Sequence, residues 1–205
     1  QNLIYEGQIY EQLNINKIEE TILSMPEVRK VQVYKRLNNT WNIDLYLIKP
    51  IARIFNKHGE TYYLDSDGKK MQRSDLHTAH TLVFSGDIGD KFDSETAVSI
   101  INNDSLKSIR DLDDIYRISN YVCKDPLLQS LIGQVYLNEN NDFIMIPVLG
   151  DQQIVFGTAH SEKEVREKFQ KLKVFYKEAI PYEGWSKYSE ISLKYEGQIV
   201  CKKAN

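Results

Sequence analysis

The apolar positions of the chain first follow a helical period. Four of them recur at helical spacing and predict an amphipathic helix: Ile15, Ile18, Ile22 and Met25. Asn16 is expected to cap this helix, and Glu19, three residues later, to close the capping box. Pro26 then ends the helix, because proline cannot continue the ladder of backbone hydrogen bonds.

An alternating pattern follows this helix. In residues 28–35 Val31 and Val33 point one way, and residues 41–48 carry apolar side chains at every second position from Trp41, which predicts two strands joined by a turn at Asn38-Asn39. A helix followed by a hairpin is the closing half of a β-α-α-β-β module. The opening half would have to lie before Ile15, so we expect this module to be truncated at its N-terminus.

A second series of elements begins after Lys49-Pro50, where the alternation is interrupted. We place a domain boundary there, which gives one domain over residues 1–50 and another over residues 51–205. Short alternating runs predict the first strands of the second domain, at residues 51–55, 61–64 and 81–85. Asp65-Ser66-Asp67-Gly68 predicts a turn.

Helical and alternating patterns then follow each other along the second domain. Residues 106–122 predict one helix, and Asp125-Pro126 begins another. Residues after this helix predict a meander of three strands, at 135–137, 143–148 and 153–157.

The last elements are a helix and a hairpin. Ser161 and Glu164 form a capping box in sequence, and we expect their helix to end at 179–181. The hairpin comprises residues 188–195 and 198–202 and turns at Glu196-Gly197. The whole pattern predicts an α+β fold, a helix-plus-hairpin module followed by a larger, mostly antiparallel β domain with helices packed on the sheet.

Composition and charge exclude some classes of function. A hydrophobic fraction of 41% and a charged fraction of 27% are ordinary for a soluble globular protein, and a net charge of -3 argues against non-specific nucleic-acid binding. No run of eighteen apolar residues is present. The chain begins at Gln1 without an initiator methionine, so we expect it to be part of a longer protein.

The two cysteines, Cys123 and Cys201, show no C-x-x-C spacing that would indicate a zinc or thioredoxin-like site. We interpret them as two isolated small apolar residues. A disulfide between them stays open in an oxidising compartment, because geometry decides the pairing.

Several linked segments resemble one family. Residues 26–33 and 41–45 look like the last helix and hairpin of a POTRA module, and residues 49–53 look like the exit from that module. Tyr62-Tyr63-Leu64 with its Asp and Gly turn is similar to an early hairpin of the following β domain. Residues 191–195 are similar to the closing strand. Together these segments resemble FtsQ, a bacterial cell-division protein with a POTRA module and a β domain.

The resemblance implies a non-enzymatic scaffold of the divisome without a cofactor. Residues 1–50 would be the POTRA-like module and residues 51–205 the FtsQ-type β domain. The chain would be the periplasmic region of a single-pass inner-membrane protein at the division septum, with its transmembrane helix outside this sequence. It would recruit FtsB-like and FtsL-like partners.

The resemblance also implies where partners bind. A partner strand would be added to the last strand of the sheet, so that backbone hydrogen bonds give affinity. The expected partner-binding residues are Tyr195, Gly197, Gln198, Ile199, Val200, Cys201 and Lys202, with Tyr188 and Lys194 as a further candidate surface. Ser192 and Lys194 replace the Asp and Arg that are frequent in the family. The expectation is therefore strand addition and not the family's particular side-chain contacts.

Each of these features also has a simpler interpretation. Residues 198–203 read equally as a short terminal strand whose lysines are ordinary solvated residues. Trp185 and Tyr188 read as a packed corner between the last helix and the hairpin. His77 and His80, with Asp75, are the one cluster with metal-ligand side chains, and we expect solvated loop histidines there and no metal site.

No nucleophile-and-base arrangement or phosphate-cradling glycine loop is visible, so no catalytic residue is assigned. The alternative function is a POTRA-type polypeptide-handling factor of envelope protein assembly or secretion. Proteins of that class usually carry tandem POTRA modules or a β-barrel, and neither pattern is present in this sequence.

Overall fold

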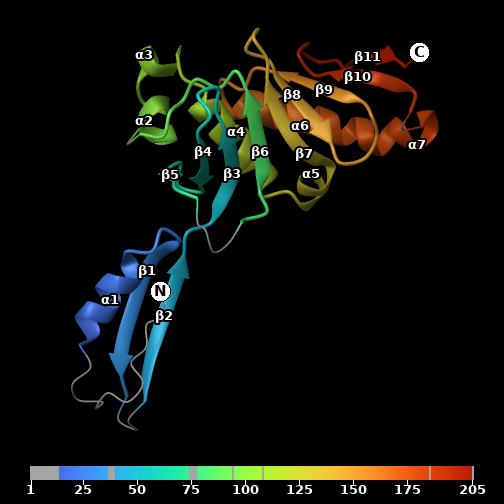
Figure 1. Ribbon diagram of the computed structural model, residues 1–205. Coiled ribbons are helices and arrows are strands. Elements are labelled where there is room, and N and C mark those ends of the chain that lie inside the picture. The colour runs from blue at the N-terminus through green and yellow to red at the C-terminus, as the bar shows by residue number, and fades with distance from the viewer. Residues whose placement is uncertain are drawn as a thin grey trace. The chain divides into compact units, whose positions relative to one another are not determined.

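The computed structural model describes residues 14–36, 40–73, 78–93, 95–107, 109–184 and 186–204. The chain divides into two compact units, Gln1–Lys49 and Pro50–Asn205 (Figure 1). The predicted turn at Asn38-Asn39, two members of the histidine cluster (His77 and Asp75) and Trp185 lie outside the described residues.

The first unit is a helix packed on a hairpin. Helix α1 (Ile15–Leu23) lies on strand β1 (Val28–Lys35), which pairs antiparallel with β2 (Trp41–Leu47). Its core consists of two helix residues and three residues of β1, namely Ile18, Ile22, Val28, Val31 and Val33.

The predicted cap of this helix is wrong. The side chain of Asn14, not that of Asn16, accepts a hydrogen bond from the backbone N–H of Lys17, so the helix begins at Ile15. Glu19 does not close a capping box either. Its Oε1 atom accepts from the backbone N–H of Val33 at 2.7 Å, which ties the helix to β1.

The second unit is built on one nine-stranded mixed sheet. Its strand order is β11-β10-β9-β8-β7-β6-β3-β4-β5. The strands are β3 (Pro50–Phe55), β4 (Thr61–Asp65), β5 (Lys70–Met71), β6 (Leu82–Gly86), β7 (Ile132–Leu137), β8 (Phe143–Pro147), β9 (Gln153–Gly157), β10 (Tyr188–Ser192) and β11 (Val200–Lys203). The pairs β3–β6, β6–β7 and β9–β10 are parallel and the others antiparallel.

Helices cover one face of this sheet. They are α2 (Ala97–Ile101), α3 (Asp104–Lys107), α4 (Leu112–Val122), α5 (Pro126–Leu131), α6 (Glu162–Glu178) and α7 (Ile180–Glu183). In Figure 1 helices α4 and α6 lie behind the sheet, and their apolar side chains form one core with the inward residues of the strands. Phe156 of β9 and Phe169 of α6, for example, are fully buried with ring centroids 4.9 Å apart. The predicted α+β class is confirmed.

The predicted single helix over residues 106–122 is wrong, because the chain forms α3 and α4 there with a break between them. Tertiary hydrogen bonds explain the break. The backbone N–H of Asp111 donates to Asp90 at 2.8 Å, and the Asp111 carboxylate accepts from the backbone N–H of Gly89 at 3.4 Å. Ile109, which helical spacing would place on the apolar face of a single helix with Leu112 and Ile115, is 70% exposed.

Other local predictions are confirmed in part. The side chain of Asp65 accepts from the backbone N–H groups of Asp67 and Lys69, which builds the predicted turn. Ser161 caps α6 by accepting from the N–H of Glu164. Glu164 does not return a bond to Ser161, however, and accepts from the backbone N–H of His160.

Candidate protein-interaction site

Strand β11 lies at the end of the sheet. It pairs antiparallel with β10, and among the described residues no strand pairs with its outer edge. Cys201 is opposite the buried Ile191 and points toward the core, whereas Val200 and Lys202 are exposed. The strand therefore has one side fixed in the sheet and one backbone edge available for a further strand.

The connection from β10 to β11 is longer than predicted. Strand β10 ends at Ser192 and β11 begins at Val200, so residues 193–199 form a loop and not a two-residue turn. Helix α6 holds this loop. The Nζ atom of Lys171 donates to the carbonyl oxygens of Leu193 at 3.3 Å and Tyr195 at 2.7 Å. The turn at Gly197 lies inside the loop, and its φ of 68° is one that glycine adopts easily.

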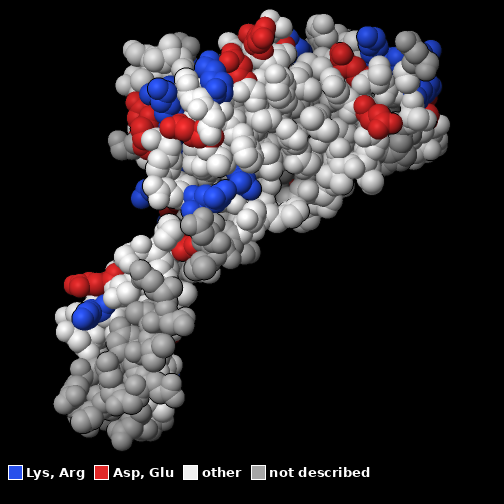
Figure 2. Space-filling model, in the orientation of Figure 1, with Lys and Arg blue, Asp and Glu red and all other residues white. Residues whose placement is uncertain are grey.

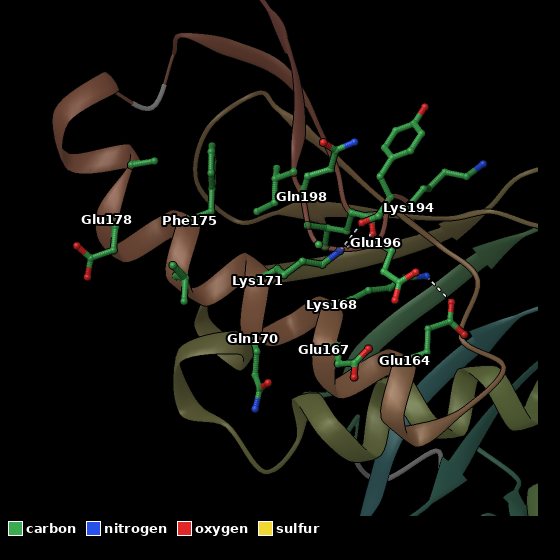
Figure 3. A pocket seen from close by; sticks show the side chains of 16 residues that line it. Glu164, Glu167, Lys168, Gln170, Lys171, Phe175, Glu178, Lys194, Glu196 and Gln198 are labelled. Carbon is green, nitrogen blue, oxygen red and sulfur yellow. Dashed lines mark hydrogen bonds and ion pairs between the residues drawn. The ribbon is translucent and has the colours of Figure 1, made fainter.

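A groove separates this loop from helix α6. Its volume is about 970 Å³, and Figure 3 shows side chains from both the helix and the loop along it. Val174 and Phe175 of α6 contribute apolar surface on one side, and Ile199 contributes it on the other, where the buried Leu193 closes the floor. Val174 is 60% exposed, so the groove offers apolar surface beside the loop that leads into β11.

The charges around the groove are partly neutralised within the chain. Lys168 is buried and donates to Glu164 at 2.5 Å and to the carbonyl oxygen of Thr158 at 2.7 Å. Although burial opposes the charged carboxylate, the hydrogen bonds from Lys168 and Thr158 hold the pKa of Glu164 below its ordinary value. Lys194 binds Asp142 at 2.7 Å.

The positive charge of Lys171 is less completely balanced by nearby carboxylates. Burial and the nearby Lys168 charge lower its pKa, while Glu167 and Glu196 act in the opposite direction. Glu167 and Glu178 also line the groove, and α6 places both along its side. A partner with amide or ammonium donors at the groove rim is therefore electrostatically suited to this surface.

The structure brings the predicted partner-binding residues together along one edge. Tyr195, Gly197, Gln198 and Ile199 line the groove, and Val200, Cys201 and Lys202 belong to β11. Of the two further candidates, Lys194 lines the groove. Tyr188 is partly buried, its ring centroid 6.0 Å from that of Phe175, and it packs against the core.

Sequence reasoning missed the contribution of helix α6. Lys171, Val174 and Phe175 line the groove, and none of them was among the expected partner-binding residues. One signal was present in the sequence, since Glu164 and Lys168 are four residues apart, which is the spacing of a helical ion pair. Nothing local indicates that Lys171 reaches the carbonyl groups of a loop more than twenty residues later.

Metal ligands, cysteines and membrane-spanning helices are the remaining features of the described residues that would bear on function. No group of three or more His, Cys, Asp or Glu side chains among the described residues is arranged to hold a metal ion. Cys123 and Cys201 are both free thiols. Within the described part of the chain, no helix combines the length and apolarity needed to cross a membrane.

Comparison with known families matches residues 49–202 to the family described as FtsQ/DivIB, C-terminal related. This chain belongs to that family. The match covers the whole nine-stranded sheet except for the last residue of β11. The FtsQ/DivIB-related proteins are non-enzymatic scaffolds of cell division, which indicates a cell-division role and association with the divisome. The comparison with curated proteins found no match.

Proposed function

We propose that this chain recruits FtsB-like and FtsL-like cell-division proteins by adding a partner strand to the outer edge of β11. The chain would act as the extracytoplasmic part of a membrane-anchored scaffold at the division septum, with residues 1–50 as a POTRA-like module. The position of β11 at the end of the strand order carries this proposal.

The surroundings of the edge support strand addition. Lys202 and Lys203 lie on β11, and lysines on an exposed edge strand commonly prevent unwanted pairing with strands of other chains. The side chain of Val200, which is 44% exposed, lies on the solvent-facing face of β11. The exposed Tyr195 lies beside the groove. A partner strand along β11 would form backbone hydrogen bonds with it. Where the partner chain continues past the end of that strand, its side chains would reach the groove.

Proline substitution in β11 tests the added strand. We expect Val200→Pro to weaken binding of a peptide from the C-terminal region of the FtsB-like partner by at least about tenfold. Val200 is paired with Ser192 and its backbone faces β10, so proline there removes a hydrogen bond between the two strands and detaches the start of β11, which is the template for the partner strand. Only the terminal strand is released, so the circular dichroism spectrum of the rest of the sheet should be retained. Isothermal titration calorimetry gives the affinity.

Two further variants complete the experiment. Val200→Thr keeps the backbone N–H and the β-branched shape and should bind within about twofold of the wild type. Val174→Asp places a charge in the groove without touching β11, and it should weaken binding if the peptide continues into the groove. Near-normal affinity of a folded Val200→Pro protein would exclude β11 as the template.

A further inference from the structure

The face of the sheet away from the helices is unusually apolar. A sheet with one solvated face normally alternates apolar and polar residues along each strand. Strand β8 does not: Phe143 and Met145 are buried beneath the helices, and the outward residues between and after them are Ile144 and Ile146. Ile146 is 41% exposed. Strand β8 is therefore apolar on both faces, although helices cover only one of them.

Neighbouring strands extend this surface. Ile144 is paired with Tyr136 of β7 and with Val155 of β9, so the three side chains lie side by side on the outward face. Val83 of β6 also lies on the outward face. It is separated from Ile146 by Gln134 of β7, which is paired with both residues. We define the open-face band as Val83, Tyr136, Ile144, Ile146 and Val155. In Figure 2, which shows this face, the area over β6 to β9 is largely free of Lys, Arg, Asp and Glu side chains.

Opposite charges stand at the two ends of the open-face band. Arg53 of β3 is paired with Val83, and its guanidinium group lies 4.7 Å from the ring centroid of Phe55. At the other end, Glu190 of β10 is paired with Gln153 of β9. A ligand lying across β3 to β10 would thus have the Arg53 cation at one end and the Glu190 carboxylate at the other, with Lys202 of β11 paired with Glu190 beyond the end of the ligand.

The size of the band selects the kind of occupant. The open-face band itself spans three inter-strand spacings, from β6 to β9, and with the flanking strands of Arg53 and Glu190 the footprint spans five, from β3 to β10. At about 4.8 Å each this is about 24 Å, and two outward residues per strand make the footprint about 10 Å wide. The resulting area, a few hundred Å², is well below the roughly 800 Å² per partner of a stable protein–protein interface. The same footprint matches one α-helix of about 16 residues, which is about 24 Å long and about 10 Å in diameter.

We propose that the open-face band is a docking surface for one amphipathic helix of a partner protein. The helix presents an uncharged apolar stripe at i, i+3, i+4 and i+7 spacing to Tyr136, Ile144 and Ile146. Its N-terminus lies toward Glu190 and its C-terminus toward Arg53, because the helix dipole is positive at the N-terminus. The proposal rests on the outward residues of β6 to β9 and does not depend on strand addition at β11.

A synthetic peptide tests this surface. The probe is an acetylated and amidated 16-residue peptide with leucines at helical spacing on one face and glutamine and alanine elsewhere; a scrambled peptide of the same composition lacks the stripe. Fluorescence anisotropy measures binding to the full chain. We expect Ile146→Asp to weaken binding at least tenfold and the scrambled peptide to bind at least tenfold more weakly than the striped one. Val98→Asp on α2 has similar exposure to Ile146 and should stay within about twofold of the wild type.

Further measurements distinguish the occupants. Ile146→Ser replaces Ile146→Asp if the latter does not fold, and it should weaken binding severalfold. A nitroxide at the peptide N-terminus should broaden the amide signal of Glu190 more than that of Arg53. Equal binding to wild type and Ile146 variants, equal binding of both peptides, or the reverse broadening would overturn the proposal. A wild-type dimer in sedimentation that Ile146→Asp abolishes would overturn it in favour of a second copy, and flotation with phosphatidylcholine vesicles in favour of a membrane.

Discussion

At the scale of single residues, the most unusual environment is a cluster of buried aspartates around the start of α4. Asp90 accepts from the backbone N–H of Asp111, and Asp114 binds Arg117 at 2.6 Å and His160 at 3.1 Å. Burial and the nearby Asp90 charge raise the pKa of Asp111 to about 6. Burial and Asp113 raise the pKa of Asp114 to about 6 as well.

These shifts predict a dependence of stability on pH. Because the pKa of Asp111 is above its ordinary value of 3.8, its contribution to the free energy of unfolding is full below about pH 4 and is lost as pH rises through about 6. Asp111→Asn keeps the acceptor for Gly89 and removes the charge. We expect the variant to lose less stability than the wild type between pH 4.5 and 7.5, by on the order of 2 kcal/mol. Urea unfolding at a series of pH values measures this.

Asp104→Asn is the matched control, because the side chain of Asp104 is 97% exposed on α3. This variant should keep the wild-type dependence on pH. If Asp111→Asn followed the wild-type curve across the whole range, the buried carboxyl of Asp111 would not be the titrating group.

At the scale of elements, helix α6 positions the loop between β10 and β11. Lys171 is the side chain that connects them, through the carbonyl oxygens of Leu193 and Tyr195. We expect Lys171→Met to lower the free energy of unfolding by about 1 kcal/mol, since two carbonyl groups lose their donor. The larger effect should be local, with amide hydrogen exchange in residues 193–199 at least about tenfold faster, as measured by mass spectrometry.

The same helix offers a control for this prediction. Lys177 is 82% exposed at its side chain, so Lys177→Met removes a lysine without releasing the loop. Its exchange pattern in residues 193–199 should match the wild type. Equal acceleration in both variants would indicate a general effect of losing charge on α6.

At the scale of the whole molecule, the two units have separate hydrophobic cores. Ile22 belongs to the core of the first unit and Ile154 to that of the second. We expect Ile22→Ala to destabilise the first unit by about 2–4 kcal/mol through the cavity it leaves, and to leave hydrogen exchange in β3 to β11 unchanged. Ile154→Ala should have the converse effect. A common shift of both units in either variant would contradict independent cores.

Much of the secondary structure could be predicted because it depends on neighbours in sequence. The strands at Val28–Lys35 and Gln153–Gly157 match the prediction at both ends, although the alternation in Val28–Lys35 is interrupted by a register shift between Val28 and Lys30. Helix α5 begins where Asp125-Pro126 predicted, because the Asp125 side chain accepts from the backbone N–H groups of Leu127 and Leu128. The predicted helix over residues 106–122 failed where a distant residue, Asp90, bonded to the backbone at Asp111.

The sequence by itself determined most of the elements, the α+β class and, through the resemblance of its segments, the family. Alternation, helical spacing and capping residues act over a few positions, so they can be recognised in the sequence without knowledge of the fold. Only the tertiary structure decided that β11 ends the sheet, that Lys171 and the loop after β10 enclose a groove, and that Ile144 and Ile146 face away from the helices. Each of these features depends on strand order and on contacts between distant residues, which no local pattern specifies.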